Sequence, residues 1–319
     1  MRVMHTHQPE DPLIDESNYL VEGTAAAFEA QLMPAVDVRQ VQNETDIEKV
    51  NELAFELYKE AVSVVNLAGH LLDDTAALNG GWQRNQAICG GLLVRITKFM
   101  TVVAQLSAGV NRADVVAALN RSILESAVNL EFLVTASDDQ YFDRFVMNGL
   151  GPERELYDTI QANIAARSGE ALPIECRMLS SIGDVCRTSG VRIEDVERKH
   201  KEWAGNVRAR LEAIGKGEYY AAMMRVPSHA VHGNWVDLYK NHLEIDPKTG
   251  LFNPKSSFSN VDERHLGPIA IVVLSAVAPY LKHYFSAIPE AGLLVARMDD
   301  LSDRISKVGS AHERLLNMK

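Results

Sequence analysis

Residues 47–72 read IEKVNELAFELYKEAVSVVNLAGHLL, and this stretch decides the fold class. Its apolar side chains recur every three or four residues, which is the period that places them on one face of an α-helix. The stripe consists of Ile47, Val50, Leu53, Ala54, Leu57, Ala61, Val64, Val65, Ala68, Leu71 and Leu72. We therefore predict one long amphipathic helix that begins near Asn43 and is followed by a turn at Asn79-Gly80-Gly81.

The same helical period continues through most of the chain. Glycine, proline and short polar residues divide it into separate helices, because these residues favour helix ends and turns. The further predicted helices cover about residues 82–109, 112–133, 140–168 with a break at 149–152, 173–189, 194–215, 218–224, 227–243, 263–285 and 290–307. The loop at 246–260 is expected to hold a small hairpin around Lys248-Thr249-Gly250, and no run of strands is visible.

The pattern predicts an all-α fold, in which residues 43–319 form a single large helical bundle with peripheral helices. Residues 1–42 are expected to form an N-terminal tail and a short helix, partly disordered. Hydrophobic residues make up 46% and charged residues 24% of the 319 residues, which is the ordinary mix of a globular protein. The chain therefore has enough apolar material for one substantial core.

The charge balance limits the partners. Lys and Arg total 32 and Asp and Glu total 43, so the formal net charge is −11. A uniformly negative surface repels phosphates, which excludes a general polyanion binder but leaves a local basic patch open. One basic cluster is interleaved with acidic residues and is typical of a solvated face. It consists of Arg198, Lys199, Lys201, Arg208 and Arg210.

The spacing of the cysteines and the hydropathy of the chain indicate where in the cell the protein is located. Cys89, Cys176 and Cys186 are too few and too far apart for a disulfide framework, so we expect reduced thiols and a cytoplasmic location. The apolar stretch at 266–281 is shorter than a membrane span and contains Pro279. It is therefore interpreted as a buried core helix, and no membrane association is expected.

Several catalytic motifs are absent from the sequence. It contains no phosphate-binding loop, no dinucleotide-binding glycine turn, no Gly-x-Ser-x-Gly elbow and no His-Glu-x-x-His helix. A di-iron bundle needs two Glu-x-x-His pairs, and Glu197-x-x-His200 is the only one. It lies in a charged run that favours a solvated face. We therefore expect no cofactor and no metal.

The most unusual stretch is RVPSHAVHGNW at residues 225–235. On a helix that begins at Pro227, Ser228 and His232 lie four residues apart and share a face, and His229 and His232 are also neighbours. An imidazole with a pKa near 6.5 exchanges protons at neutral pH. The histidines are candidates for proton transfer, although they could equally cap or pack within the bundle.

A metal site is the other alternative for these histidines. His229, His232, Asp237 and His242 are close in sequence and carry suitable ligand atoms. The five-residue steps from His232 to Asp237 and from Asp237 to His242 rotate the side chains away from a shared helix face. The spacing therefore disfavours a metal.

A second polar set interrupts the apolar stripes. Arg95 lies between Leu92 and Phe99, which predicts a place on the buried side of its helix. Arg121 and Glu125 are four residues apart, with Asn129 one turn further. A buried arginine must be paired, so an Arg–Glu ion pair that fixes helix register is one interpretation. The other is a cleft beside His232 in which Arg95 or Arg121 faces an anionic ligand.

These residues carry a family resemblance. The segment RSILESAVNL at 121–130, Ser228-x3-His232-Gly233, the loop at 251–254 and the final apolar helix resemble an uncharacterised bacterial all-helical family over about residues 45–290. That family is distantly similar to the HEPN bundles of defence and toxin-type systems, many of which are dimeric, metal-independent ribonucleases. Their signature is Arg, four to six residues, then His, and six residues separate Arg225 from His232.

The resemblance implies two hypotheses. In the first, the protein is a ribonuclease whose partner is RNA and which acts as a homodimer. His232, Arg225 and His229 are the candidate catalytic residues, with His232 transferring a proton and Arg225 stabilising transition-state charge. In the second, it is a non-catalytic helical module that binds a partner protein or a small anionic ligand. The candidate ligand-binding residues are Arg95, Arg121, Glu125 and Ser228.

Overall fold

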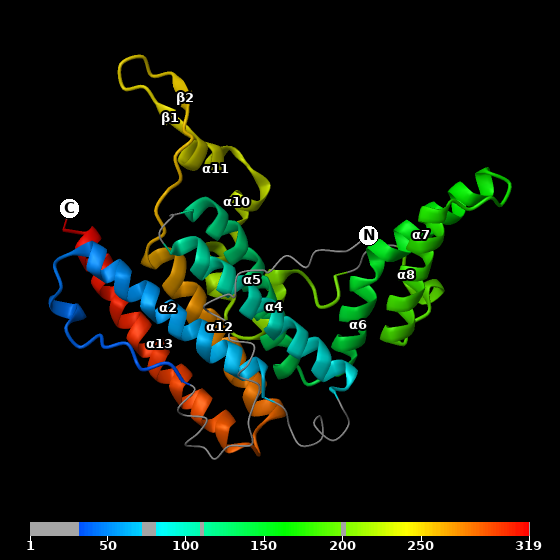
Figure 1. Ribbon diagram of the computed structural model, residues 1–319, viewed down its shortest axis with the longest axis horizontal. Helices are drawn as coiled ribbons and strands as arrows, with labels where there is room; N and C mark the ends of the chain where they lie inside the picture. Colours follow the sequence, from blue (N-terminus) through cyan, green and yellow to red (C-terminus); the bar gives the residue numbers. More distant parts are fainter. Residues whose placement is uncertain (1–31, 72–80, 109–111, 199–201, 319) are drawn as a thin grey trace, which may run out of the picture.

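The computed structural model describes residues 32–71, 81–108, 112–198 and 202–318, and long helices form its centre (Figure 1). They are α2 (Ile47–Gly69), α4 (Arg84–Ser107), α5 (Ala113–Thr135), α12 (Glu263–Tyr284) and α13 (Pro289–Leu316). Helix α12 packs against α5, α13 and α2, and α4 packs against α5 and α2. The predicted all-α fold is confirmed.

Helix α2 shows how the sequence pattern becomes packing. The Asp46 side chain accepts a hydrogen bond from the Glu48 backbone N–H at 3.0 Å, which satisfies one of the N–H groups that have no partner within the helix. Along the apolar stripe, Val50, Leu57 and Val65 are almost completely buried. The helix ends at Gly69, and most of the turn predicted at 79–81 lies outside the described residues. Most of the predicted tail at 1–42 also lies outside them.

Helices α4 and α12 are each long and apolar enough to cross a membrane by length and composition. This property is weak evidence for a membrane span, because the core helix of a soluble protein shares it. Helix α12 packs against α5, α13, α2 and α4, as expected for the apolar residues at 266–281.

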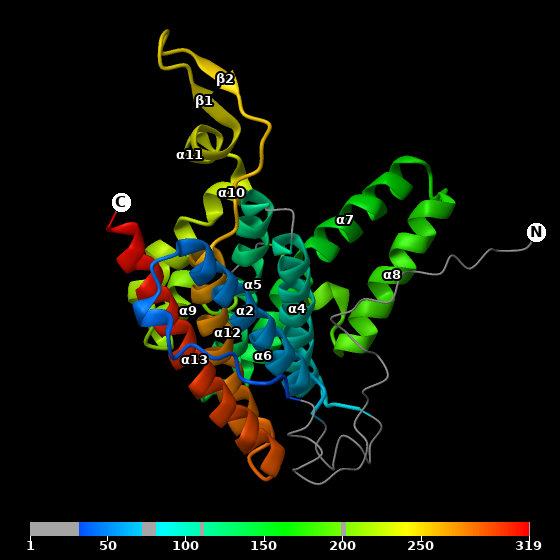
Figure 2. The same cartoon turned by 60° about the vertical axis from the view of Figure 1, so that its left-hand side comes forward.

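A helical hairpin projects from the bundle beside α6 (Gln140–Gly149). It consists of α7 (Gly151–Ala166) and α8 (Pro173–Ser189), and Figure 2 shows it standing away from the long helices. The predicted break at 149–152 and the predicted end at Gly190, which has a positive φ of 67°, are confirmed. The hairpin has a small core of its own, made of Leu150, Ile182, Cys186 and Val196.

The predicted helix at 194–215 is wrong. A 3₁₀ turn at Ile193–Asp195 is followed by residues 196–198 and 202–206, which form no helix, and α9 covers only Val207–Ala213. Asn206 begins this short helix, because its side chain accepts a hydrogen bond from the Ala209 backbone N–H at 3.0 Å. An Asn at this position competes with helix continuation on its N-terminal side.

The predicted helix at 227–243 is also interrupted. A π-helix, η4 (Ala221–Arg225), leads into α10 (Ser228–His232), which ends at Gly233 with φ 55°. The Asn234 side chain then caps α11 (Trp235–Asp237), and a second π-helix, η5 (Leu238–His242), follows. Gly233 adopts the left-handed conformation that terminates helices, so the chain changes direction there.

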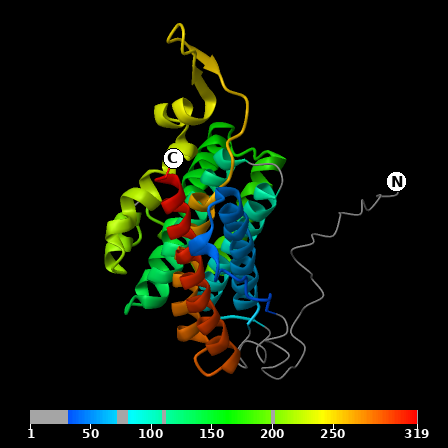
Figure 3. The same ribbon diagram turned by 90° about the vertical axis from the view of Figure 1, so that its left-hand side faces the viewer.

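A short β-hairpin completes the projecting part of the chain. Strands β1 (Leu243–Ile245) and β2 (Phe252–Pro254) pair antiparallel, with Leu243 opposite Pro254. The predicted hairpin around residues 248–250 is therefore confirmed. Figures 1 and 3 show that it stands off one end of the bundle beyond α10 and α11.

Candidate functional site

One face of α5 lines an open cleft of about 390 Å³. Arg121, Glu125 and Asn129 are spaced four residues apart on this face, and all three are half-buried. The opposite wall comes from residues 202–210 and from the segment that runs from Tyr220 to Ser228. The cleft therefore joins a long core helix to the irregular part of the chain.

Arg121 links two walls of the cleft. Its Nη1 donates to Glu125 Oε2 at 2.9 Å, and its Nε donates to Ser228 Oγ at 3.2 Å. The Ser228 hydroxyl in turn donates to the Met224 carbonyl at 2.5 Å. The predicted Arg121–Glu125 pair is present, and its bond to Ser228, the first residue of α10, connects α5 to α10.

Arg210 is the deepest cation in this cleft. It is 5% exposed, its Nη1 donates to the Gly205 carbonyl at 2.6 Å, and its guanidinium lies 4.9 Å from the Trp203 ring centroid. Its Nη2 lies 4.0 Å from Glu125 Oε1. Burial lowers the pKa of Arg210 below its ordinary value, and neighbouring Arg121 lowers it further, whereas the Glu125 and Glu202 carboxylates raise it.

The interpretation of Arg210 as part of a solvated face is therefore wrong. Arg208, two residues earlier, is exposed and pairs with Glu212 on the same short helix, as a solvated cation does. The two arginines differ in their position relative to Val207 and Leu211, the apolar residues of α9 that pack on the core. Arg210 lies next to this apolar face of the helix, and Arg208 lies away from it. That difference is visible only once the true start of α9 is known.

The structure places Arg225 and His232 outside the cleft lining. Both side chains are exposed, and in the described part of the chain neither makes a hydrogen bond or an ion pair. They lie at the two ends of a helical segment, since Val226 and Pro227 between η4 and α10 also have right-handed helical dihedrals. His229 is half-buried, and its Nδ1 lies 2.5 Å from the Asn234 amide nitrogen.

Arg95 does not reach this cleft, and the expectation of a buried position is wrong. Its side chain is exposed on α4, where its Nε donates to Ser126 Oγ at 3.2 Å and its guanidinium covers the Phe99 ring at 4.4 Å. The fully buried face of α4 carries Leu93 and Ile96 instead. Arg95 therefore joins α4 to α5 at the edge of their interface.

The metal hypothesis finds no support in the geometry. Asp237 Oδ2 lies 3.4 Å from His242 Nε2, whereas His229 contacts Asn234. Over the residues with described positions, no three His, Cys, Asp or Glu side chains gather as metal ligands. His200 of the Glu197-x-x-His200 pair lies outside the described residues.

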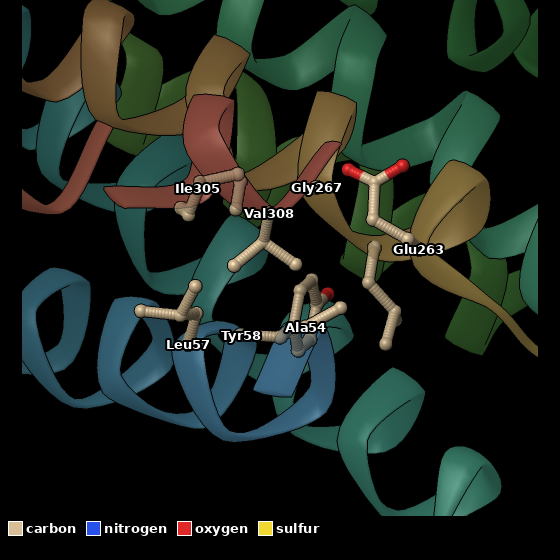
Figure 4. Close-up of a pocket in the computed structure, with 9 residues that line it drawn as sticks. Ala54, Leu57, Tyr58, Glu263, Gly267, Ile305 and Val308 are labelled. Carbon is tan, nitrogen blue, oxygen red and sulfur yellow. The ribbon is translucent and has the colours of Figure 1, made fainter. Parts of the chain in front are cut away.

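A second polar group lies deep in the bundle but lines no usable space. Glu263, at the start of α12, is 6% exposed among apolar side chains of α2 and α13, including Leu57 and Val308 (Figure 4). The hollow beside it is too small for a water molecule. Desolvation raises the pKa of Glu263 to about 7, and the Asp262 and Glu313 carboxylates contribute to the shift.

Comparison with known proteins adds a family for this region. The model of a family of unknown function, DUF5677, matches residues 86–249, just over half of the chain. The match begins near the start of α4 and ends in the β-hairpin, so it includes the cleft and the Arg225–His232 segment. No curated protein and no solved structure matches the chain.

Proposed function

Since the chain belongs to the DUF5677 family, whose function is unknown, we propose an activity from geometry alone: the cleft between α5 and α9 binds a small anionic ligand. The observation that carries this proposal is the sharing of one carboxylate by two arginines. Arg121 and Arg210 both face Glu125, at 2.9 Å and 4.0 Å. One of these two positive charges is therefore not neutralised within the group.

Burial makes Arg210 the stronger anion-binding candidate of the two. A desolvated guanidinium gains more from a new anionic partner than an exposed one, because water screens it less. Glu202 also lines the cleft, but it is exposed, so solvent screens its charge. Arg210 Nε and Asn129 Oδ1 are buried without a hydrogen-bond partner in the described structure, and a ligand that bonded to both would satisfy them.

The size of the cleft limits the ligand. A volume of about 390 Å³ falls within the range of small-molecule sites, roughly 300–1,000 Å³. The ligand is therefore a compact carboxylate or phosphate compound that carries a hydrogen-bond donor for Asn129 as well as an anionic group.

Native mass spectrometry of the purified protein, followed by calorimetry with citrate and with inorganic phosphate, tests this proposal. We expect Arg121→Gln to weaken binding and Glu125→Gln to strengthen it, because the second change frees a positive charge. Arg208→Gln is the matched control, since Arg208 is exposed and pairs with Glu212. Equal affinities for all three variants and the wild type, or no bound anion, would refute the proposal.

A second candidate function is metal-independent RNA cleavage by a HEPN-like protein of a defence or toxin-type system. The observation that favours it is the free exposure of Arg225 and His232 on one helical segment. At α-helical geometry the seven steps from Arg225 to His232 make about two turns, so we expect the two side chains on roughly the same side, about 10 Å apart along the axis. An imidazole can take the 2′-hydroxyl proton, and a guanidinium can stabilise the charged phosphorus centre.

This candidate includes a homodimer in the cytoplasm, in which a second copy supplies another Arg225 and His232. Incubation with RNA in EDTA tests it. We expect cleavage by the wild type, loss of cleavage in His232→Ala, and normal cleavage in His283→Ala, which removes an exposed histidine from α12. Equal cleavage by both variants would remove His232 from the mechanism.

A further inference from the structure

The projecting part of the chain exposes an unusual amount of apolar surface. More than half of the large apolar side chains that are exposed in the described residues lie between Val226 and Phe258, about a tenth of the chain. Trp235 is 58% exposed, Phe252 48% and Tyr239 46%. Contiguous exposed apolar surface on a folded protein marks an interaction site more often than chance.

Three of these side chains form one aromatic cluster. The Trp235 ring lies 5.6 Å from Phe252, edge to face, and 6.1 Å from Tyr239. The Asn234 cap holds Trp235 in place, and the pairing of Phe252 with Ile245 fixes the hairpin. The cluster is therefore supported by backbone structure from both sides, while its rings remain exposed.

Positively charged side chains lie in the same segment as the three aromatic rings. Residues 225–258 contain four Lys or Arg and three Asp or Glu, in a chain with a net charge of −11. Asp237 is buried, and Asp246 accepts hydrogen bonds from the Lys248 and Thr249 backbone. Lys240 directly follows Tyr239, and Lys255 Nζ lies 3.4 Å from the Lys240 carbonyl. Near the rings, Lys240, Lys248 and Lys255 therefore stand against the exposed Glu244 and the half-buried Asp246, which leaves a small positive excess.

We infer that the cluster of Trp235, Tyr239 and Phe252 is a binding surface for single-stranded nucleic acid. Exposed rings offer flat faces on which unpaired bases stack, and neighbouring lysines attract the backbone phosphates. A protein partner would need apolar and acidic side chains in a matching arrangement, whereas every single-stranded nucleic acid carries bases next to phosphates, which is why nucleic acid is favoured. The inference depends neither on the anion cleft nor on RNA cleavage, although the surface adjoins Arg225 and His232 along the chain.

Fluorescence anisotropy with a labelled single-stranded RNA, in EDTA, tests the inference on the full-length protein. We expect Trp235→Ala and Phe252→Ala each to weaken binding by about fivefold to a hundredfold, the usual value of one base–ring stack. The double change Lys240→Gln and Lys255→Gln should reduce the dependence of affinity on salt. Tyr219→Ala is the matched control, since Tyr219 is also 48% exposed but lies outside the cluster. A DNA strand of the same sequence tests whether the sugar matters, and a duplex should bind more weakly.

The outcomes separate this inference from cleavage. RNA binding that persists in His232→Ala and fails in Trp235→Ala supports the surface, whether or not the protein cuts RNA. Equal binding by Trp235→Ala, Phe252→Ala and Tyr219→Ala overturns it. Self-association that depends on Trp235, in a protein that binds no RNA, also overturns it and makes the cluster an interface between copies.

Discussion

Replacing Glu263 with glutamine tests whether a carboxyl group lies uncharged inside the bundle. Burial raises its pKa from the ordinary 4.5 to about 7, with Asp262 and Glu313 adding repulsion and Arg264 and His265 opposing it. The folded protein thus keeps a proton that the unfolded chain releases, so stability falls as the pH rises from about 4.5 to about 7. A rise of two to three pKa units, at about 1.4 kcal/mol per unit, corresponds to a loss of roughly 3 kcal/mol in the free energy of unfolding.

Glutamine has nearly the same shape but does not ionise, so the variant lacks this loss. We expect the stability of Glu263→Gln relative to the wild type to rise by roughly 2 to 3 kcal/mol between about pH 5 and about pH 8. Urea denaturation followed by circular dichroism measures this difference. Glu52→Gln, at an exposed position of α2, is the control and should show the same offset at both pH values. A Glu263→Gln offset that does not change with pH would refute a buried neutral carboxyl.

The remaining predictions concern packing and backbone geometry. Gly267→Ala should lower the melting temperature, because an added Cβ would collide with Glu263 Oε1; unchanged melting would show that the carboxylate moves aside easily. Glu60→Ala should cost about 3 to 5 kcal/mol in urea denaturation, since it removes the buried partner of the Arg304 guanidinium, 2.6 Å away, and leaves the exposed Asp300 carboxylate as its ion-pair partner. Gly233→Ala should destabilise by about 1 kcal/mol because φ there is 55°, and a stabilised variant would contradict the left-handed turn.

The long helices could be predicted from the sequence because each buries a broad apolar face whose period is visible in one chain. Helix α8 has the predicted bounds, Pro173–Ser189, since proline opens it and a glycine closes it. The segment from 194 to 243 could not be predicted in the same way. There the helix boundaries depend on side chains of Asn206 and Asn234 that cap the backbone, and a polar residue within a charged run gives little sign of that role.

The site was predictable only where its parts are neighbours in sequence. The Arg121–Glu125 pair follows from a four-residue spacing on one helix. The approach of Arg210 to Glu125 joins segments far apart in the chain, and no local pattern indicates it. Arg95 was misplaced because Leu92 and Phe99, which flank it, are themselves only partly buried at the edge of α4.

The separate small core of the α7–α8 hairpin has a consequence for how the molecule unfolds. Its four buried side chains do not belong to the main core of the bundle, so the hairpin can open while the long helices stay packed. Amide hydrogens in α7 and α8 then exchange with solvent sooner than those of α12. We therefore expect heating to melt two units in succession, so that one transition temperature would not describe both.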